Sequence, residues 1–139
     1  MLPAEPPPAL LLADDTPSIR QLLSHLLLDV TPWEVVAVPD AAAALAVLAA
    51  RPVPLVIADY HLPDMNGDTL ATTIKARSPD TKIVIITADI EFDGSNQWPH
   101  VDVCLIKPFR LHELVTTIGT LLPNVARARV VGPQKHTAR

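Results

Sequence analysis

The stretch "IADYHLPDMNG", residues 57 to 67, joins an apolar run to an aspartate, a proline and a glycine. The apolar run begins in "PLVIA" (54–58) and does not alternate with polar residues, which is typical of a parallel strand buried on both faces. Asp59 therefore lies where a buried strand stops. Taken alone, this position suits a helix cap, a turn former, a metal ligand or a nucleophile.

Four more apolar runs of this kind predict further strands: "ALLLA" (9–13), "WEVVAV" (33–38), "KIVIIT" (82–87) and "DVCLI" (102–106). Helical patterns lie between the runs or after them, at residues 17–29, 41–50, 68–78 and 111–122. Thr16 and Asp40 precede two of these patterns as candidate N-caps. Strands that alternate with helices predict an α/β fold with a doubly wound, five-stranded parallel sheet and right-handed crossovers.

One segment breaks the alternation. Residues 88–100, "ADIEFDGSNQWPH", should hold the fourth helix, but they contain poor helix formers and no apolar stripe. We expect a loop or a single turn there, so that the fourth helix is atypical or missing.

Length and composition favour one compact domain, because 139 residues with 49% apolar content fill a single core. The prolines before residue 9 suggest a disordered lead-in over 1–8, followed by a domain over 9–122 and a flexible basic tail over 123–139. The tail holds four of the 11 basic residues and no acidic ones, so the rest of the chain has a net charge of −8. This charge argues against a general polyanion binder, and we expect no direct nucleic-acid binding. A solvated tail is favoured over a docking arm for an acidic partner or nucleic acid.

Cys104 is the only cysteine, which excludes an intrachain disulfide and a cysteine-based zinc cluster and predicts a buried, inert thiol. No apolar run approaches the roughly 20 residues that a membrane helix needs. The first residues lack the basic start and long apolar stretch of a signal peptide. We therefore expect a cytoplasmic protein without a membrane partner.

Chemistry-bearing side chains gather where the predicted strands end. Asp14 and Asp15 follow the first strand, Asp59 the third, Thr87 the fourth and Lys107 the fifth. The carboxyl ends of parallel strands are where open α/β sheets bind ligands. Carboxylates about 4 to 5 Å apart repel by roughly 3 to 4 kcal/mol per pair at an effective dielectric near 20, so the cluster needs a cation. An all-oxygen ligand set favours Mg²⁺, and a carboxylate beside that ion can attack a phosphoryl group, which the lysine and the threonine would stabilise.

In this order, the elements "ADD" (13–15), "IADYHLPDMNG" (57–67), "TA" (87–88) and "KPF" (107–109) resemble the response-regulator receiver domain of two-component signalling. The resemblance covers about residues 9–122 and implies a flavodoxin-like fold with strand order 2-1-3-4-5. It also implies that Asp59 is the phosphoacceptor and a Mg²⁺ ligand, that Asp15 is a direct ligand, and that Asp14 acts through water. The backbone carbonyl of His61 would complete the protein's share of the metal shell.

By the same resemblance, Thr87 and Lys107 hold the phosphoryl group with help from the backbone amide of Ala88, and the bond between Lys107 and Pro108 is cis. The implied partner is a sensor histidine kinase or a phosphotransfer protein, with a homodimer as a possible output. The protein would not be an enzyme beyond its own phosphoryl transfer and autodephosphorylation.

The chain departs from the family three residues before the lysine, where receivers commonly carry a tyrosine or phenylalanine and this chain has Cys104. A thiol cannot reproduce a ring that moves between solvent and core. Trp98 is either a replacement switch residue or, as the sequence favours, a packed aromatic that acts as a lid. His61 is a candidate phosphotransfer residue, but a side chain at the rim of the site that limits water access is favoured, with Asp89 as its companion.

Two alternatives stay open. A phosphatase of the haloacid-dehalogenase type also uses a strand-end aspartate and Mg²⁺, but His61 occupies the place of its second aspartate. The chain could also be a receiver fragment of a larger transcription factor or hybrid kinase, although the starting methionine and the tail favour a stand-alone protein.

Overall fold

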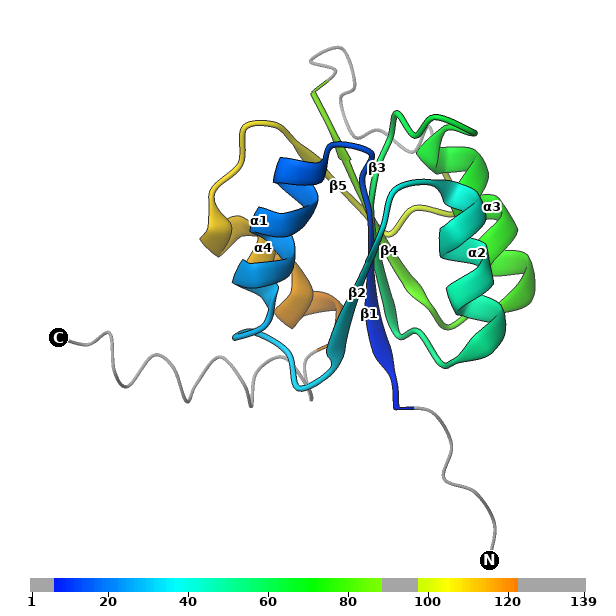
Figure 1. The fold of residues 1–139 in the computed structure, drawn as a ribbon, viewed down its shortest axis with the longest axis horizontal. Coiled ribbons are helices and arrows are strands. Elements are labelled where there is room, and N and C mark those ends of the chain that lie inside the picture. Colours follow the sequence, from blue (N-terminus) through cyan, green and yellow to red (C-terminus); the bar gives the residue numbers. More distant parts are fainter. Residues whose placement is uncertain (1–6, 89–97, 123–139) are drawn as a thin grey trace, which may run out of the picture.

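The computed structural model describes residues 7–88 and 98–122, in which strands and helices alternate around one sheet (Figure 1). The strands are β1 (Ala9–Ala13), β2 (Glu34–Val38), β3 (Leu55–Asp59), β4 (Lys82–Thr87) and β5 (Val103–Ile106). The helices are α1 (Pro17–Leu27), α2 (Ala41–Ala50), α3 (Gly67–Arg77) and α4 (Leu111–Leu121). All strand pairs are parallel, in the order β2-β1-β3-β4-β5, which confirms the predicted sheet.

Burial explains why the apolar runs do not alternate. Every residue of β1 is buried, as are all but one each in β3 and β4, because helices cover both faces of these central strands. The edge strands β2 and β5 are mostly half-buried or exposed. The middle of the sheet is therefore apolar, and the polar residues of the central strands lie only at the strand ends.

Two helical layers complete the core, one on each face of the sheet (Figure 1). Helices α1 and α4 pack Leu23, Leu27, Leu114 and Ile118 against one face of the central strands. Helices α2 and α3 pack smaller residues, together with Leu70 and Ile74, against the other. Consecutive residues of a strand point to opposite faces, so each central strand contributes to both core clusters.

The predicted boundaries differ from the observed ones by one or two residues. Helix α1 ends at Leu27 rather than at residue 29, and α3 begins at Gly67 rather than after it. Thr16 occupies the N-cap position of α1 but makes no side-chain cap hydrogen bond. Asp40 caps α2 as predicted, because its carboxylate accepts the N–H of Ala43 at 2.8 Å.

No helix lies between β4 and β5 among the residues described there, which are 88 and 98–102. Residues 89–97, the bulk of the predicted loop, lie outside the described part of the chain. Most of the lead-in predicted over 1–8 and the whole tail predicted over 123–139 also lie outside it. These predictions therefore stay predictions.

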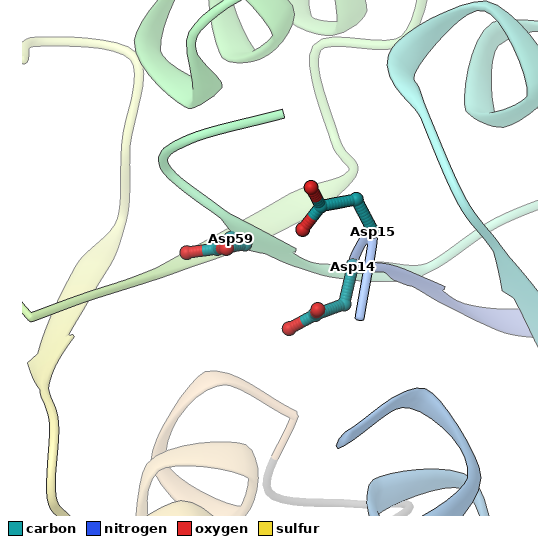
Figure 2. Close-up of side chains that lie close together, drawn as sticks. All are labelled: Asp14, Asp15 and Asp59. Carbon is teal, nitrogen blue, oxygen red and sulfur yellow. The ribbon is translucent and has the colours of Figure 1, made fainter. Parts of the chain in front are cut away.

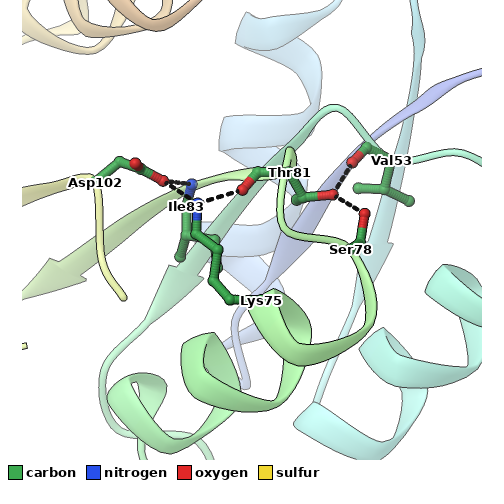
Figure 3. A network of polar contacts seen from close by, with 6 residues as sticks. All are labelled: Val53, Lys75, Ser78, Thr81, Ile83 and Asp102. Atoms are coloured by element: carbon green, nitrogen blue, oxygen red, sulfur yellow. Dashed lines mark hydrogen bonds and ion pairs between the residues drawn. The ribbon is translucent and has the colours of Figure 1, made fainter. Parts of the chain in front are cut away.

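A polar network ties α3 to the amino end of β4 and to the approach to β5 (Figure 3). The buried Thr81 hydroxyl donates to the Val53 carbonyl at 2.7 Å, and Lys75 Nζ donates to the Thr81 carbonyl at 2.8 Å. Lys75 also pairs with the carboxylate of Asp102 at 3.0 Å, and the same carboxylate oxygen accepts the N–H of Ile83 at 2.8 Å. The chain that enters β5 is thus fixed to its neighbours before the strand begins.

Within residues 7–88 and 98–122, none of the helices has both the length and the apolar character that crossing a membrane requires.

Gly67 is the position where a side chain is least tolerated. A Cβ there would lie 3.1 Å from the Tyr60 Cα and 3.2 Å from the Asp59 carbonyl oxygen, both backbone atoms that cannot move aside cheaply. We expect Gly67→Ala to lower the free energy of unfolding by about 1 to 3 kcal/mol, measured by urea denaturation. Gly119→Ala in α4 is the matched control: nothing lies within 4 Å of its Cβ, so it should stabilise by about 0.5 to 1 kcal/mol. Equal effects at both positions would contradict the steric explanation.

Candidate functional site

Three carboxylates converge at the carboxyl edge of the sheet (Figure 2). Asp14 and Asp15 follow β1, and Asp59 is the last residue of β3, the strand that pairs with β1. One oxygen atom from each lies within 4.8 Å of the others. Among the described residues this is the single group of three or more His, Cys, Asp or Glu side chains that could hold a metal ion. The structure therefore brings together the acidic residues that the sequence placed at separate strand ends.

The two aspartates after β1 lie in different environments. Asp14 is buried, with 2% exposure, and its carboxylate accepts the N–H of Thr16 at 2.9 Å. Its own N–H donates to the Val38 carbonyl at 3.0 Å, and its carbonyl accepts Arg20 Nη1 at 2.8 Å. Asp15 is exposed. The backbone of Thr16 therefore serves both the site and α1, because its carbonyl accepts the N–H of Arg20 at 2.9 Å.

Asp59 is subject to opposing electrostatic effects. Burial raises its pKa above the ordinary value, Lys107 opposes that rise, and the negative charge of Asp14 adds to it. Lys107 Nζ lies 3.8 Å from Asp59 Oδ1, and the backbone N–H of His61 also bonds to the carboxylate. The net direction of the pKa is upward, so one lysine does not compensate for burial and the neighbouring negative charges. A cation at this edge would offset the remaining negative charge.

The chain after Asp59 is held close to the sheet. The Tyr60 N–H donates to the Ile86 carbonyl of β4 at 2.8 Å, and the Gly67 N–H donates to the Tyr60 carbonyl at 2.7 Å. His61 and Asn66 form an antiparallel bridge between these points. The loop from β3 to α3 thus closes on itself and leaves the Asp59 carboxylate at the edge of the sheet.

Sequence reasoning missed Asp64, which joins this loop to α2. Its two carboxylate oxygens accept the N–H groups of Ala41 and Ala42 at 2.9 and 2.8 Å. The bond from Ala41 is the main reason that the pKa of Asp64 lies below its ordinary value. No local pattern signals this contact, because its partners are 22 and 23 residues away in the chain.

The expected phosphoryl-binding residues lie at the ends of the next two strands. Thr87 is fully buried at the end of β4, and Ala88 after it is exposed. The Lys107 N–H donates to the Thr87 carbonyl at 2.7 Å, which joins the ends of β4 and β5. The bond between Lys107 and Pro108 is cis, as the resemblance implied.

Of the two departures, Cys104 differs from expectation in its burial. Its side chain is half-buried in the edge strand β5 rather than fully buried, yet this is enough to raise the pKa of the thiol to about 11. Trp98 is also half-buried and packs against the core cluster on the α2 and α3 face. Of the two residues expected at the rim of the site, His61 is exposed and Asp89 lies outside the described residues.

The donor set fits the chemistry expected of the site. Three carboxylates and backbone carbonyls supply only oxygen atoms, which Mg²⁺ prefers and which soft-metal sites lack. The Asp59 carboxylate, a lysine and a buried hydroxyl residue lie at neighbouring strand ends. Such an arrangement can hold a divalent cation and accept a phosphoryl group.

Comparison with known proteins agrees with this geometry. The family model of the response regulator receiver domain matches residues 10–119. The chain is 34% identical over 111 residues to the response regulator protein FleR of Pseudomonas aeruginosa, an alignment that covers 78% of this chain and 23% of FleR. It is 31% identical over 115 residues to the response regulator receiver protein CpdR of Brucella abortus, covering 81% of this chain and 95% of CpdR. The chain thus spans less than a quarter of one relative and nearly all of the other.

Among solved structures, the response regulator protein TrrA of Thermotoga maritima, in complex with Mg²⁺ and BeF, is similar to this chain with a TM-score of 0.74. The two sequences are 28% identical, and the match covers 82% of this chain and 98% of TrrA.

The charge at Asp59 should cost stability when no cation is present. We expect Asp59→Asn to raise the urea midpoint at pH 7 in the presence of a chelator, because it removes a buried charge beside Asp14, a gain that exceeds the lost attraction to Lys107. The raised pKa of Asp59 destabilises the fold at a pH above about 3.9, the ordinary value, and this cost disappears as pH falls through the folded-state pKa. The advantage of the variant should therefore vanish in acid and should narrow at pH 7 when Mg²⁺ stabilises the wild type. A less stable Asp59→Asn protein at pH 7 would contradict this account.

The Cys104 thiol should react slowly. A pKa of about 11 leaves roughly one thiolate in a thousand at pH 8, against about a quarter for a free thiol of pKa near 8.5. We expect iodoacetamide labelling of the folded protein to be about two-hundredfold slower than that of the urea-unfolded chain and to speed up about tenfold per pH unit. Labelling at the same rate in both states would show that burial does not protect the thiol.

Proposed function

The chain belongs to the response-regulator receiver family, and from this premise we propose that Asp59 accepts a phosphoryl group from a phosphohistidine of a sensor histidine kinase or of a phosphotransfer protein. Receivers of this family are the signalling modules of two-component systems. The observation that carries the proposal is the convergence of the Asp14, Asp15 and Asp59 carboxylates within 4.8 Å, with Lys107 beside Asp59. Like charges this close repel one another, and a bound divalent cation would offset that repulsion and serve phosphoryl transfer.

We assign the metal site to Mg²⁺, with Asp15, Asp59 and the His61 carbonyl as direct ligands and Asp14 as a ligand through water. The different burial of Asp14 and Asp15 supports this division, because the Asp14 carboxylate is buried and already accepts the Thr16 N–H while Asp15 is open to solvent. TrrA, which is similar in fold, is a complex with Mg²⁺ and BeF. When bound, Mg²⁺ would offset the charge of the carboxylates and of the phosphoryl oxygens.

The residues of this chain then perform the transfer. An Asp59 oxygen attacks the phosphorus of the donor, so that a P–O bond forms as the P–N bond breaks and the electron pair leaves with the imidazole, which takes up a proton. Lys107 and the Thr87 hydroxyl bind the phosphoryl oxygens, and the Ala88 amide assists. Water later attacks the phosphorus of the acyl phosphate, so that a new P–O bond forms, the P–O bond to Asp59 breaks, inorganic phosphate leaves and the Asp59 carboxylate is restored, with the His61 side chain at the rim of the site. This autodephosphorylation would be the only reaction besides phosphoryl acceptance.

The result of phosphorylation would be a changed surface and hence a changed affinity for a partner or for a second copy of the chain. The exposed His61 and the absence of an aspartate two residues after Asp59 leave a haloacid-dehalogenase-type phosphatase without its general acid. FleR and CpdR represent a longer and a receiver-length architecture, respectively. The stand-alone organisation remains a prediction, which the position of the stop codon in the gene tests.

Phosphoryl acceptance is tested by brief exposure of the protein to acetyl phosphate with Mg²⁺, followed by intact-mass measurement. We expect the wild type to gain one phosphoryl group, which hydroxylamine removes because an acyl phosphate is labile to it. Asp59→Asn should gain none, and Lys107→Met should gain it at least tenfold more slowly because the phosphoryl oxygens lose their fixed positive charge.

Arg110→Met, which removes a nearby positive charge outside the proposed site, serves as the matched control and should react like the wild type. A phosphoryl group that survives in Asp59→Asn would place the acceptor elsewhere. Its absence from the wild type would overturn the proposed function.

A further inference from the structure

Three aromatic rings connect the approach to β5 with the residues that follow Asp59. The Trp98 and Tyr60 rings are stacked, with centroids 4.7 Å apart and an angle of 12° between their planes. The Tyr60 ring meets the His61 ring edge-on, with centroids 4.8 Å apart. Tyr60 and His61 are the first two residues after the proposed phosphoacceptor, so the row of rings ends at the site.

The Trp98 end of this row is firmly anchored. The Val101 N–H donates to the Trp98 carbonyl at 3.1 Å and closes a turn, and Val101 and Trp98 both pack against the core on the α2 and α3 face. The Asp102 N–H then donates to the Ile83 carbonyl at 2.9 Å. The Asp102 carboxylate is held by Ile83 and Lys75 (Figure 3). The indole that contacts Tyr60 is therefore held by a hydrogen-bonded turn that packs against the core and lies far from Tyr60 in the sequence.

The other end of the row adjoins groups of the proposed site. The backbone of Tyr60 is fixed by Ile86 and Gly67, and its ring is supported by Trp98. The orientation of the next residue, His61, decides where its N–H meets the Asp59 carboxylate and where its carbonyl points. The His61 side chain is exposed and meets the edge of the Tyr60 ring. Support for Tyr60 is therefore also support for His61.

We propose that Trp98 is a positioning residue for the metal and phosphoryl site, acting through its stack on Tyr60 to hold His61 in the orientation that binds the cation. This inference rests on the proposed function and adds to it a residue outside the acidic cluster. The physical reason is preorganisation: the stack orders Tyr60 and His61 when the protein folds, so that binding need not order them again. The Trp98 side chain makes no polar contact with the cation in this account.

A reciprocal effect follows from thermodynamic linkage. If the stack favours the cation-bound arrangement, then the cation must favour the stack to the same degree. Trp98 should therefore report on binding at Asp59 although it is not a ligand. A tryptophan that only fills the core would show no such response.

The affinity test uses Mn²⁺ as the probe, with the free ion counted by electron paramagnetic resonance and Mg²⁺ as competitor. We expect Trp98→Leu, which keeps an apolar side chain but removes the stacking ring, to weaken Mn²⁺ and Mg²⁺ binding by roughly two- to tenfold, the range set by one aromatic pair. Trp98→Phe restores a ring that can stack and should recover most of the affinity. Both variants are compared at a temperature where circular dichroism shows them fully folded.

Trp33 provides the matched control, because it is half-buried against the core cluster on the opposite face of the sheet. Trp33→Leu should lower the melting temperature without changing the affinity for Mn²⁺. Trp33→Phe leaves Trp98 as the sole tryptophan, since the chain has two. In that variant we expect the fluorescence of Trp98 to change on addition of Mg²⁺ and to change again when beryllofluoride is added.

The outcomes separate this inference from the proposed function. A wild type that binds the ion and takes up a phosphoryl group, together with an unchanged affinity in Trp98→Leu, would overturn the role of Trp98 alone. An equal loss of Mn²⁺ affinity in Trp33→Leu would show that general destabilisation causes the loss, and it would also overturn the role of Trp98. A wild type that binds no ion would overturn both proposals.

Discussion

The mutual repulsion of three carboxylates dominates the electrostatics at the carboxyl edge of the sheet. Asp14 and Asp15 directly follow β1, and Asp59 is the last residue of β3; both strands are buried on both faces. One oxygen atom from each carboxylate therefore lies within 4.8 Å of the others at one edge of the sheet. A flexible scaffold would relieve the repulsion by moving the chains apart. The central strands cannot do this, because each is packed between two helical layers and paired with its neighbours. Because the carboxylates cannot separate, a cation that binds at this edge would lower their electrostatic energy.

Several backbone hydrogen bonds hold this edge in place against that repulsion. The Thr16 N–H restrains the Asp14 carboxylate, and the bonds from Tyr60 and Gly67 close the loop after Asp59. Asp64 extends the same loop to the N-terminus of α2, where two free N–H groups and the helix dipole favour its negative charge. The loop that follows the proposed phosphoacceptor is therefore hydrogen-bonded both to β4 of the sheet and to the N-terminus of α2.

The aromatic row from Trp98 to His61 is a second connection of this kind, and it leads from the site toward β5. Its importance lies in the contrast with Cys104, which occupies the position where related receivers commonly carry an aromatic ring. The thiol is half-buried and stays protonated, since its pKa is raised to about 11, so it offers neither a ring nor a charge. The Tyr60–Trp98 stack, in contrast, is a direct physical contact between the residues that follow Asp59 and the approach to β5.

The strand order was available only from the resemblance to receiver domains, but the sequence was enough to predict five strands, four helices, their parallel arrangement and the acidic residues at the carboxyl edge of the sheet. These features follow from local patterns: continuous apolar runs mark buried strands, helical spacing marks α1 and α4, and polar residues at run ends mark the carboxyl edge of a parallel sheet. The folded structure was needed to show that Asp64 accepts two N–H groups at the start of α2 and that Trp98 stacks on Tyr60. Both contacts join residues more than twenty positions apart in the chain. No periodicity or propensity encodes such contacts, because they depend on which surfaces the folded chain brings together.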